Sequence, residues 1–473
     1  MRTYTNQDLI VHRELDRPGG IEKVLVSIVF IFSSGLFDPS IVPDFGLFRI
    51  NDLFMSVAAG VGVSLQFTRL RGELAKLSPS SLWAIFAFYG FVGLSIFWSH
   101  SPVSATARYI GFVLTTLWTL YAATRFSLRE LLTILIATLF AMAIISLVLA
   151  IAVPNLGTMT VDAHRGDWKG IYGHKNTLGR NMALLTYLSL FCVLFSGPRK
   201  LGLASLAVAL LVLFMAGSRT AYIVSGIGLF SVLLLVLRRR PWIIVLVGIG
   251  TAFAVLTATL QSVIEGNPAL QLQAESIDVF QTEISFTGRF GLWQFSIEWI
   301  AKQPWFGYGY DGFWKIKELG GQHLAIEGWG ANDSHNGYID ILLQIGFIGL
   351  IVYFFVYFTF LFRSGLRIRR ERISYEDLFA SLILFVFFFA NLTESYLLKA
   401  TSIFQLLFTY SLILLSKKRK TSVAGNRRNE PDSQPPPPPS EGRRHSLLRP
   451  KPEESADQST QEQNVRLRPG DAQ

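Results

Sequence analysis

Four short stretches of the sequence combine protonatable or cationic side chains with glycine and aromatic neighbours. They are GIYGHKNTLG (170–179), FMAGSRTAY (214–222), SFTGRFGLW (285–293) and GANDSHNGYIDILLQIGFIGL (330–350). Arg219 and Arg289 each carry a planar guanidinium that can hold phosphate through two parallel hydrogen bonds. His335 has an aspartate nearby, and such a histidine can titrate near neutral pH and act as a base. On one face of a protein, these groups would suit transfer from an anionic substrate.

The first stretch is typical of a helix start that could bind an anion. We expect Asn176 or Thr177 to cap the helix, with His174 and Lys175 at its mouth and glycines that let a ligand approach. Structural explanations remain open for each group. Lys175 would then reach lipid phosphate, Arg219 would anchor the membrane interface, and His335 would only donate a structural hydrogen bond.

The composition indicates a membrane protein with many spans. Of 473 residues, 51% are hydrophobic and only 16% are charged. The net charge of +10 comes from lysine and arginine in short loops and in the tail, so no nucleic-acid partner is expected. The single Cys192 excludes an intramolecular disulfide. We expect the first apolar segment to be a retained membrane helix and not a cleaved signal.

Twelve apolar runs are long enough to be considered membrane helices. They are 22–37, 47–66, 80–98, 106–124, 128–153, 177–196, 201–216, 219–237, 241–263, 337–362, 377–393 and 400–416. The loops with clustered lysine and arginine all fall on one side under this count, which predicts that both termini are cytoplasmic. The predicted fold class is therefore all-α: a polytopic membrane protein with about 12 transmembrane helices.

The same count divides the chain into five parts. They are a cytoplasmic N-terminus (1–21), transmembrane helices one to nine (22–263), a large periplasmic loop (264–336), helices ten to twelve (337–416) and a disordered, proline-rich cytoplasmic tail (417–473). The polyproline run in the tail could bind a partner, although a solvated tail is the simpler interpretation. All four of the stretches quoted above then fall on the outer side.

The large outer loop contains a segment from Arg289 to Ile300 with the pattern of an amphipathic helix, which Pro304 should end. Its aromatic residues could stack on sugar rings or anchor the membrane interface, and the sequence does not separate these roles. No metal-ligand spacing and no nucleotide-binding loop is present, so we expect neither metal nor cofactor. The outer loops also show no compact carboxylate cluster, with Asp38 and Asp44 the nearest candidates. The predicted site is cationic.

The order of these motifs around one long outer loop resembles the O-antigen ligase and polymerase superfamily of bacterial membrane glycosyltransferases. The matching residues are GIYGHKNTLG, GSRTAY, TGRFGLW with PWFGYGYDGFW, and DSHNGYIDILLQIGFIGL. Within the superfamily the chain is most similar to exopolysaccharide polymerases of the ExoQ type. The resemblance implies a GT-C-like membrane fold and a metal-independent enzyme of the bacterial inner membrane whose active site faces the periplasm.

The resemblance also implies a substrate and residue roles. The donor would be an undecaprenyl-diphosphate-linked oligosaccharide, and the acceptor a growing polysaccharide. Arg219 and Arg289 would bind the diphosphate, and His335 would activate the acceptor hydroxyl. The predicted substrate-binding residues are His174, Lys175, Asn176, Arg165 and Asn336. Besides the lipid bilayer, chain-length and export proteins are compatible partners.

Two other functions remain open at this point. A ligase would transfer a finished glycan to lipid A core or to a protein, and it would differ only in its acceptor pocket. A polysaccharide transporter or export component would also suit twelve helices, but it would not need an outer cluster of His and Arg far from the membrane midplane.

Overall fold

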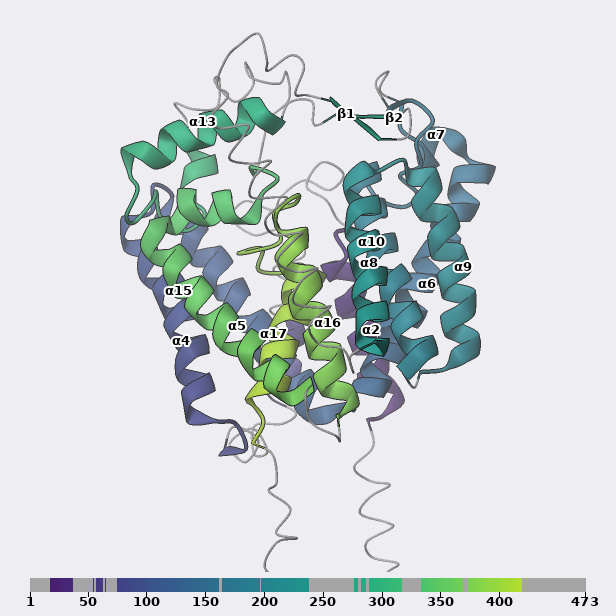
Figure 1. Ribbon diagram of the computed structural model, residues 1–473, viewed down its shortest axis with the longest axis horizontal. Helices are drawn as coiled ribbons and strands as arrows, with labels where there is room; N and C mark the ends of the chain where they lie inside the picture. The colour runs from purple at the N-terminus through teal and green to yellow at the C-terminus, as the bar shows by residue number, and fades with distance from the viewer. Residues whose placement is uncertain are drawn as a thin grey trace, which may run out of the picture. The chain divides into compact units, whose positions relative to one another are not determined.

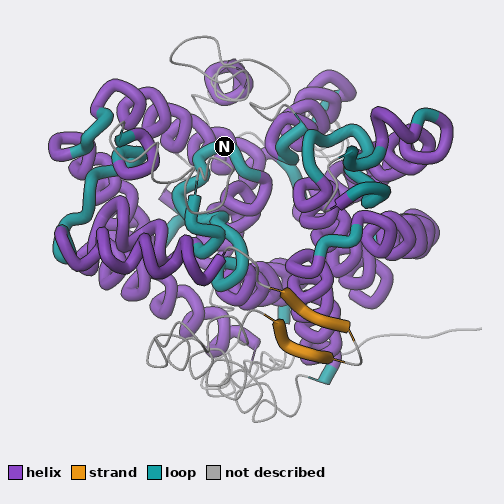
Figure 2. Tube along the Cα trace, turned by 90° about the horizontal axis from the view of Figure 1, so that it is seen from above, coloured by secondary structure: helices purple, strands orange, loops and turns teal. Residues whose placement is uncertain are grey.

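The structure of the chain is a computed structural model. It describes residues 18–36, 54, 57–62, 64, 75–160, 164–195, 197–237, 276–279, 282–285, 289–316, 333–368 and 373–418. Most helices in this part of the chain run in a common direction, seen from the side in Figure 1 and along their axes in Figure 2. The predicted all-α, polytopic class is confirmed, and six of the described helices are long and apolar enough to cross a membrane.

The long helices coincide with predicted spans. They are α2 (Gly20–Ser33), α4 (Pro79–Leu94), α5 (Pro102–Arg125), α6 (Leu128–Ala152), α8 (Lys175–Phe195), α9 (Arg199–Ala216), α10 (Arg219–Val236), α15 (Gly337–Ile368), α16 (Tyr375–Ala390) and α17 (Ile403–Ser416). The predicted span 47–66 is described only in part, and 241–263 lies outside the described residues. The number twelve therefore stays a prediction.

Local sequence explains several helix boundaries. Ser127 and Glu130 form a reciprocal capping box at the start of α6. At the end of α9, Gly217 adopts a left-handed conformation (φ 59°), which turns the chain so that α10 begins two residues later. This tight turn places Ser218 beside the start of α8, where its hydroxyl donates to Asn176 Oδ1, and it agrees with predicted spans that end at 216 and begin again at 219.

Helix α8 lies in the core of the bundle and packs against α9 and α10, while α16 packs against α17 and α10. Most α8 side chains are buried, including the run from Met182 to Leu185. Because α8 begins at Lys175, the second half of the GIYGHKNTLG stretch belongs to this central helix, and most of its residues are buried.

Basic residues gather at one end of the bundle. The guanidinium of Arg367 donates to the carbonyl oxygens of Leu415 (2.8 Å) and Lys417 (3.1 Å), and the Lys417 ammonium donates to the carbonyl of Ala123 (3.0 Å). The ends of α5, α15 and α17 therefore meet there. The helix ends that carry the four stretches singled out in the sequence lie at the opposite end, with α13 (Arg289–Lys302) (Figure 1).

The long outer loop contains both expected and unexpected elements. The predicted amphipathic helix is confirmed as α13, and it ends two residues before Pro304. The sequence did not predict the antiparallel hairpin of β1 (Ser276–Val279) and β2 (Thr282–Ser285). Short helical turns complete the described part: η1 (Ser95–Trp98), α7 (Pro154–Gly157) and η3 (Phe313–Lys315).

Candidate active site

His335 occupies a strained turn just before α15. It has a left-handed backbone (φ 51°), and its backbone N–H donates to Oδ1 of Asp333 at 3.0 Å. From the sequence, Ser334 or Asp333 would be expected to cap α15, but neither does. Asn336 caps α15, because its Oδ1 accepts the backbone N–H groups of Tyr338 (3.0 Å) and Ile339 (3.3 Å). This turn projects the imidazole away from the helix.

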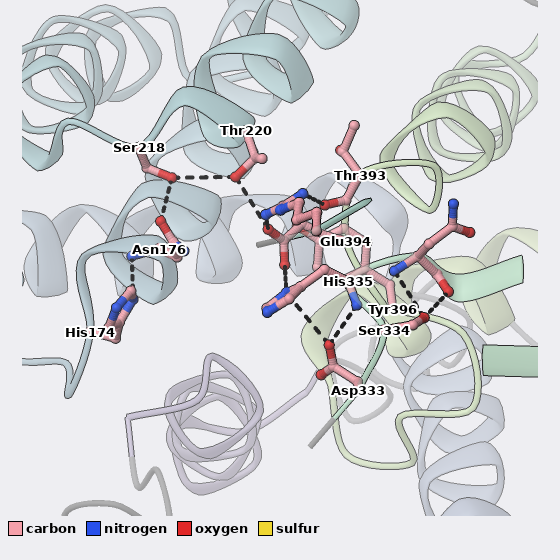
Figure 3. Close-up of polar contacts among 12 residues, drawn as sticks. His174, Asn176, Ser218, Thr220, Asp333, Ser334, His335, Thr393, Glu394 and Tyr396 are labelled. Atoms are coloured by element: carbon pink, nitrogen blue, oxygen red, sulfur yellow. Dashed lines mark hydrogen bonds and ion pairs between the residues drawn. The ribbon is translucent and has the colours of Figure 1, made fainter. Parts of the chain in front are cut away.

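Two carboxylates flank the His335 imidazole (Figure 3). Its Nδ1 lies 3.5 Å from Asp333 Oδ1 and 3.7 Å from Glu394 Oε2. Asp333 comes from the same turn, whereas Glu394 follows α16. On its other side Asp333 contacts the ammonium of Lys399, which comes from the same segment as Glu394. The expectation that the outer loops hold no compact carboxylate cluster is therefore wrong, and the site has mixed charge.

Arg289, the first residue of α13, completes this cluster. Its Nη2 donates to Glu394 Oε1 at 3.0 Å and its Nη1 donates to the carbonyl of Thr393 at 2.5 Å. The turn that presents Glu394 is shaped by Asn391, whose Oδ1 accepts the N–H groups of Tyr396 and Leu397, both at 3.0 Å. The prediction that Arg289 and His335 lie together is supported, with Glu394 between them.

The charged groups of this cluster shift one another's pKa values. Burial alone would lower the pKa of His335, but the contact with Glu394 and the charge of Asp333 raise it above its usual value. Burial alone would raise the pKa of Glu394, but His335 and Arg289 lower it to about 2. The pKa of Asp333 is likewise held low, mainly by Lys399. The imidazole is thus made more basic while both carboxylates stay ionised.

A line of polar contacts joins this cluster to the GIYGHKNTLG stretch (Figure 3). The Thr220 hydroxyl donates to Glu394 Oε1 at 3.2 Å and lies 3.5 Å from the Ser218 hydroxyl. Ser218 donates to Oδ1 of Asn176 at 2.9 Å, and the Asn176 backbone N–H donates to Nδ1 of His174 at 3.1 Å. His174 and Asn176 therefore lie on the same polar line as Glu394. Helix α8 begins at Lys175, so the cap predicted at Asn176 or Thr177 is wrong.

Arg219 is the first residue of α10 and its side chain is exposed. Among the described residues no hydrogen bond or ion pair holds it. Its neighbour in the chain, Thr220, contacts Glu394, which places Arg219 at the edge of the cluster.

Three predicted substrate-binding residues have other positions. The Lys175 ammonium is buried, bonds Asp167 Oδ2 at 2.6 Å and lies 3.4 Å from the Gly217 carbonyl. Arg165 is exposed on the neighbouring turn. Asn336 is buried as the cap of α15 and donates to the Leu392 carbonyl at 3.3 Å. The hydrogen bonds of Lys175 and Asn336 given above go to Asp167, Gly217 and Leu392, and not to the His335 imidazole.

The structure separates the aromatic residues of the outer loop into two groups. The Trp293 indole donates to the Ser334 carbonyl at 2.8 Å, next to His335, and Trp299 packs on Tyr308. By contrast, Trp305 and Phe306 are 63% and 51% exposed, as expected for side chains that face lipid.

Sequence reasoning missed Glu394, Thr220 and Lys399. A weak signal existed, because the segment ANLTESYLLK places a carboxylate between two apolar runs. Asp38 and Asp44 lie outside the described residues. In the described part of the chain no group of three or more His, Cys, Asp or Glu side chains is arranged to hold a metal ion, and metal independence stays a prediction.

Comparison with known proteins supports the resemblance. Residues 204–354 match the family model described as O-antigen ligase, a stretch that includes Arg219, Arg289 and His335. The chain is also 26% identical over 321 residues to the exopolysaccharide production protein ExoQ of Rhizobium meliloti (strain 1021), with 65% of this chain and 70% of that protein covered. The similarity to the O-antigen ligase and polymerase superfamily, and to ExoQ within it, is confirmed.

Proposed function

We propose, from its resemblance to the O-antigen ligase and polymerase superfamily, that this protein is a membrane glycosyltransferase. It joins oligosaccharide repeat units, carried on undecaprenyl diphosphate, into exopolysaccharide. The single observation that carries this proposal is the cluster of Arg289, Glu394 and His335, which unites a phosphate-binding group with a basic imidazole at one end of a membrane bundle.

The reaction needs little from the protein beyond charge and position. The acceptor hydroxyl oxygen forms a bond to the anomeric carbon of the donor sugar. The bond from that carbon to the diphosphate oxygen breaks, and the diphosphate leaves with the electron pair. Arg289 and Arg219 bind the diphosphate and stabilise the developing charge. Bound donor competes with Glu394 for the Arg289 guanidinium.

The proton of the acceptor hydroxyl goes to His335. The flanking carboxylates of Asp333 and Glu394 raise the pKa of the imidazole, so it accepts the proton more readily, and they stabilise the imidazolium that forms. The Nδ1 contacts of 3.5 Å and 3.7 Å are longer than hydrogen bonds, and such contacts commonly tighten only when substrate is bound.

The proposed location is the bacterial cytoplasmic membrane, with the His335 end facing the periplasm. Its support is the grouping of basic residues at the opposite end of the bundle. Cysteines placed at the exposed Arg165, in the outer loop before α8, and at Ser374, in a Cys192→Ala background, test this topology. An impermeant thiol reagent should label position 165 in intact cells, and labelling of position 374 would contradict the orientation.

Chemical analysis of surface polysaccharide tests the activity. Cells that lack the gene should carry single repeat units, whereas cells that express the full chain should carry polymer. Purified protein should elongate lipid-linked oligosaccharide in the presence of EDTA. Loss of activity with EDTA would contradict metal independence.

A ligase is the second candidate, because the matching family model is described as O-antigen ligase. A ligase would transfer finished polymer to a separate acceptor with the same cluster. In the same gene-deletion experiment, full-length polymer that is not attached to its acceptor would indicate this alternative.

A further inference from the structure

Helix α15 is broken at Gly346, within the stretch that is long and apolar enough to span a membrane. Gly346 has φ 66° and ψ −171°, a conformation that is essentially restricted to glycine. The break frees backbone groups that a continuous helix would pair. In a membrane such groups must find partners inside the protein.

A turn of the outer loop, residues 304–308, supplies these partners. The N–H groups of Phe347 and Ile348 donate to the carbonyls of Pro304 (2.8 Å) and Trp305 (3.2 Å), and the N–H of Tyr308 donates to the Leu343 carbonyl (2.8 Å). In a continuous helix the Phe347 N–H would bond the Leu343 carbonyl. The turn thus inserts between these two groups and bonds both.

Glycine at two positions makes this approach possible. A Cβ atom at Gly346 would overlap the Trp305 carbonyl, and one at Gly307 would lie 2.6 Å from the Leu343 carbonyl oxygen. Gly307 also has a left-handed backbone (φ 62°). Any side chain at either position must therefore push the turn out of the break.

The 304–308 turn is bonded on its other sides as well. The Trp98 indole donates to the Phe306 carbonyl at 3.0 Å, and the Tyr308 hydroxyl donates to the Trp299 carbonyl in α13 at 2.9 Å. Since α13 begins with Arg289 and α15 begins two residues after His335, one turn connects the two helices that carry the cluster.

We propose that the 304–308 turn stays inserted in the break of α15 and holds α13 in place, so that Arg289 remains beside the His335 cluster. We call this inserted turn the splice. Gly346 and Gly307 are then positioning residues. The splice stays in place during turnover and does not act as a lid, because its departure would leave the freed backbone groups of α15 unpaired. The consequence for catalysis rests on the proposed function.

A cross-link tests whether the splice stays in place. The rings of Trp305 and Phe347 are 6.4 Å apart, and both side chains are exposed. Cysteines at these two positions, in a Cys192→Ala background, should form a disulfide on oxidation, detected as a mobility shift after proteolysis between them. The control pair, Trp305→Cys with Phe362→Cys, should not. The cross-linked protein should retain at least half of the polymerising activity of its reduced form.

Two results would overturn the inference. Failure of the Trp305→Cys, Phe347→Cys pair to cross-link would show that the turn does not occupy the break. Activity lost on cross-linking and restored by reductant would show that the turn must move, as a lid does. Cross-link formation needs no enzymatic activity. If the wild-type protein makes no polymer, the proposed function fails, while the splice itself is still confirmed or contradicted.

Glycine substitutions test the positioning role. Gly346→Ala should lower kcat by about 100-fold through misplacement of Arg289, with a much smaller change in acceptor KM. Gly365→Ala is the matched control on the same helix, since a Cβ there meets no atom within 4 Å. If Gly346→Ala does not insert, Gly307→Ala provides the same test. Wild-type kcat in a folded Gly346→Ala or Gly307→Ala variant would contradict the proposal.

Discussion

Two cations at the same end of the bundle differ in how their charge is used. Lys175, at the start of α8, bonds Asp167 tightly at 2.6 Å and ties that loop to the Gly217 turn. Arg289, at the start of α13, shares Glu394 with Thr220 and with His335, whose Nδ1 is 3.7 Å away. The first arrangement fixes a helix end. The second is a branched network, because Arg289 also donates to the Thr393 carbonyl, and under the proposed function a bound diphosphate would compete for it.

The largest expected effect is at the basic imidazole. His335→Ala should lower the transfer rate by about 100- to 10,000-fold, the range typical of a lost general base. Binding of the lipid-linked donor should change little, because in the proposed mechanism His335 acts on the acceptor. His164→Ala is the matched control, an exposed histidine at the same end of the bundle. Lost donor affinity with an intact rate would mean that the roles of His335 and Arg289 are exchanged.

The next effect separates guanidinium geometry from charge. Arg289→Lys should lower kcat by roughly 100-fold, because an ammonium cannot hold diphosphate through a planar fork. Arg165→Lys, which alters an exposed arginine outside the cluster, should leave the rate unchanged. Single-turnover kinetics on purified protein would measure both. Full activity in Arg289→Lys would show that charge alone is sufficient and would weaken the comparison with Lys175.

A smaller effect concerns the pH dependence. Glu394 raises the pKa of His335, so Glu394→Gln should lower that pKa. Activity that requires a neutral imidazole is lost as pH falls through this pKa, so the acid limb of the kcat profile should move to lower pH. Glu376→Gln, at the other end of α16, controls for the lost charge. An acid limb that moves to higher pH or stays in place would exclude His335 as the titrating base.

The sequence predicted the helices well because each membrane span depends only on the residues of its own segment. The predicted run 128–153 corresponds to α6, Leu128–Ala152, since a membrane helix needs only a continuous apolar segment. The Arg289–Glu394 contact joins residues 105 positions apart, and no local pattern encodes it. Glu394 was missed for this reason.

Side-chain direction was the second limit. Lys175 was expected at the mouth of the site, since glycines and a histidine surround it in the sequence. Its partner, Asp167, is only eight residues away. A flexible side chain beside a helix start can point outward or back over the loop, and only tertiary packing decides between them.

The smallest expected effect on catalysis is at Lys175, and it sharpens the comparison most. Lys175→Met should destabilise the protein by about 1–3 kcal/mol, because it leaves the Asp167 carboxylate and the Gly217 carbonyl without their donor. Activity per folded molecule should remain close to wild type. Thermal unfolding in detergent, together with donor titration, measures the two quantities separately. Lys175→Met combined with Asp167→Leu should recover part of the stability, since neither charge then remains. A stable Lys175→Met variant with a strongly raised donor KM would instead make Lys175 a substrate-binding residue, and the contrast with Arg289 would fail.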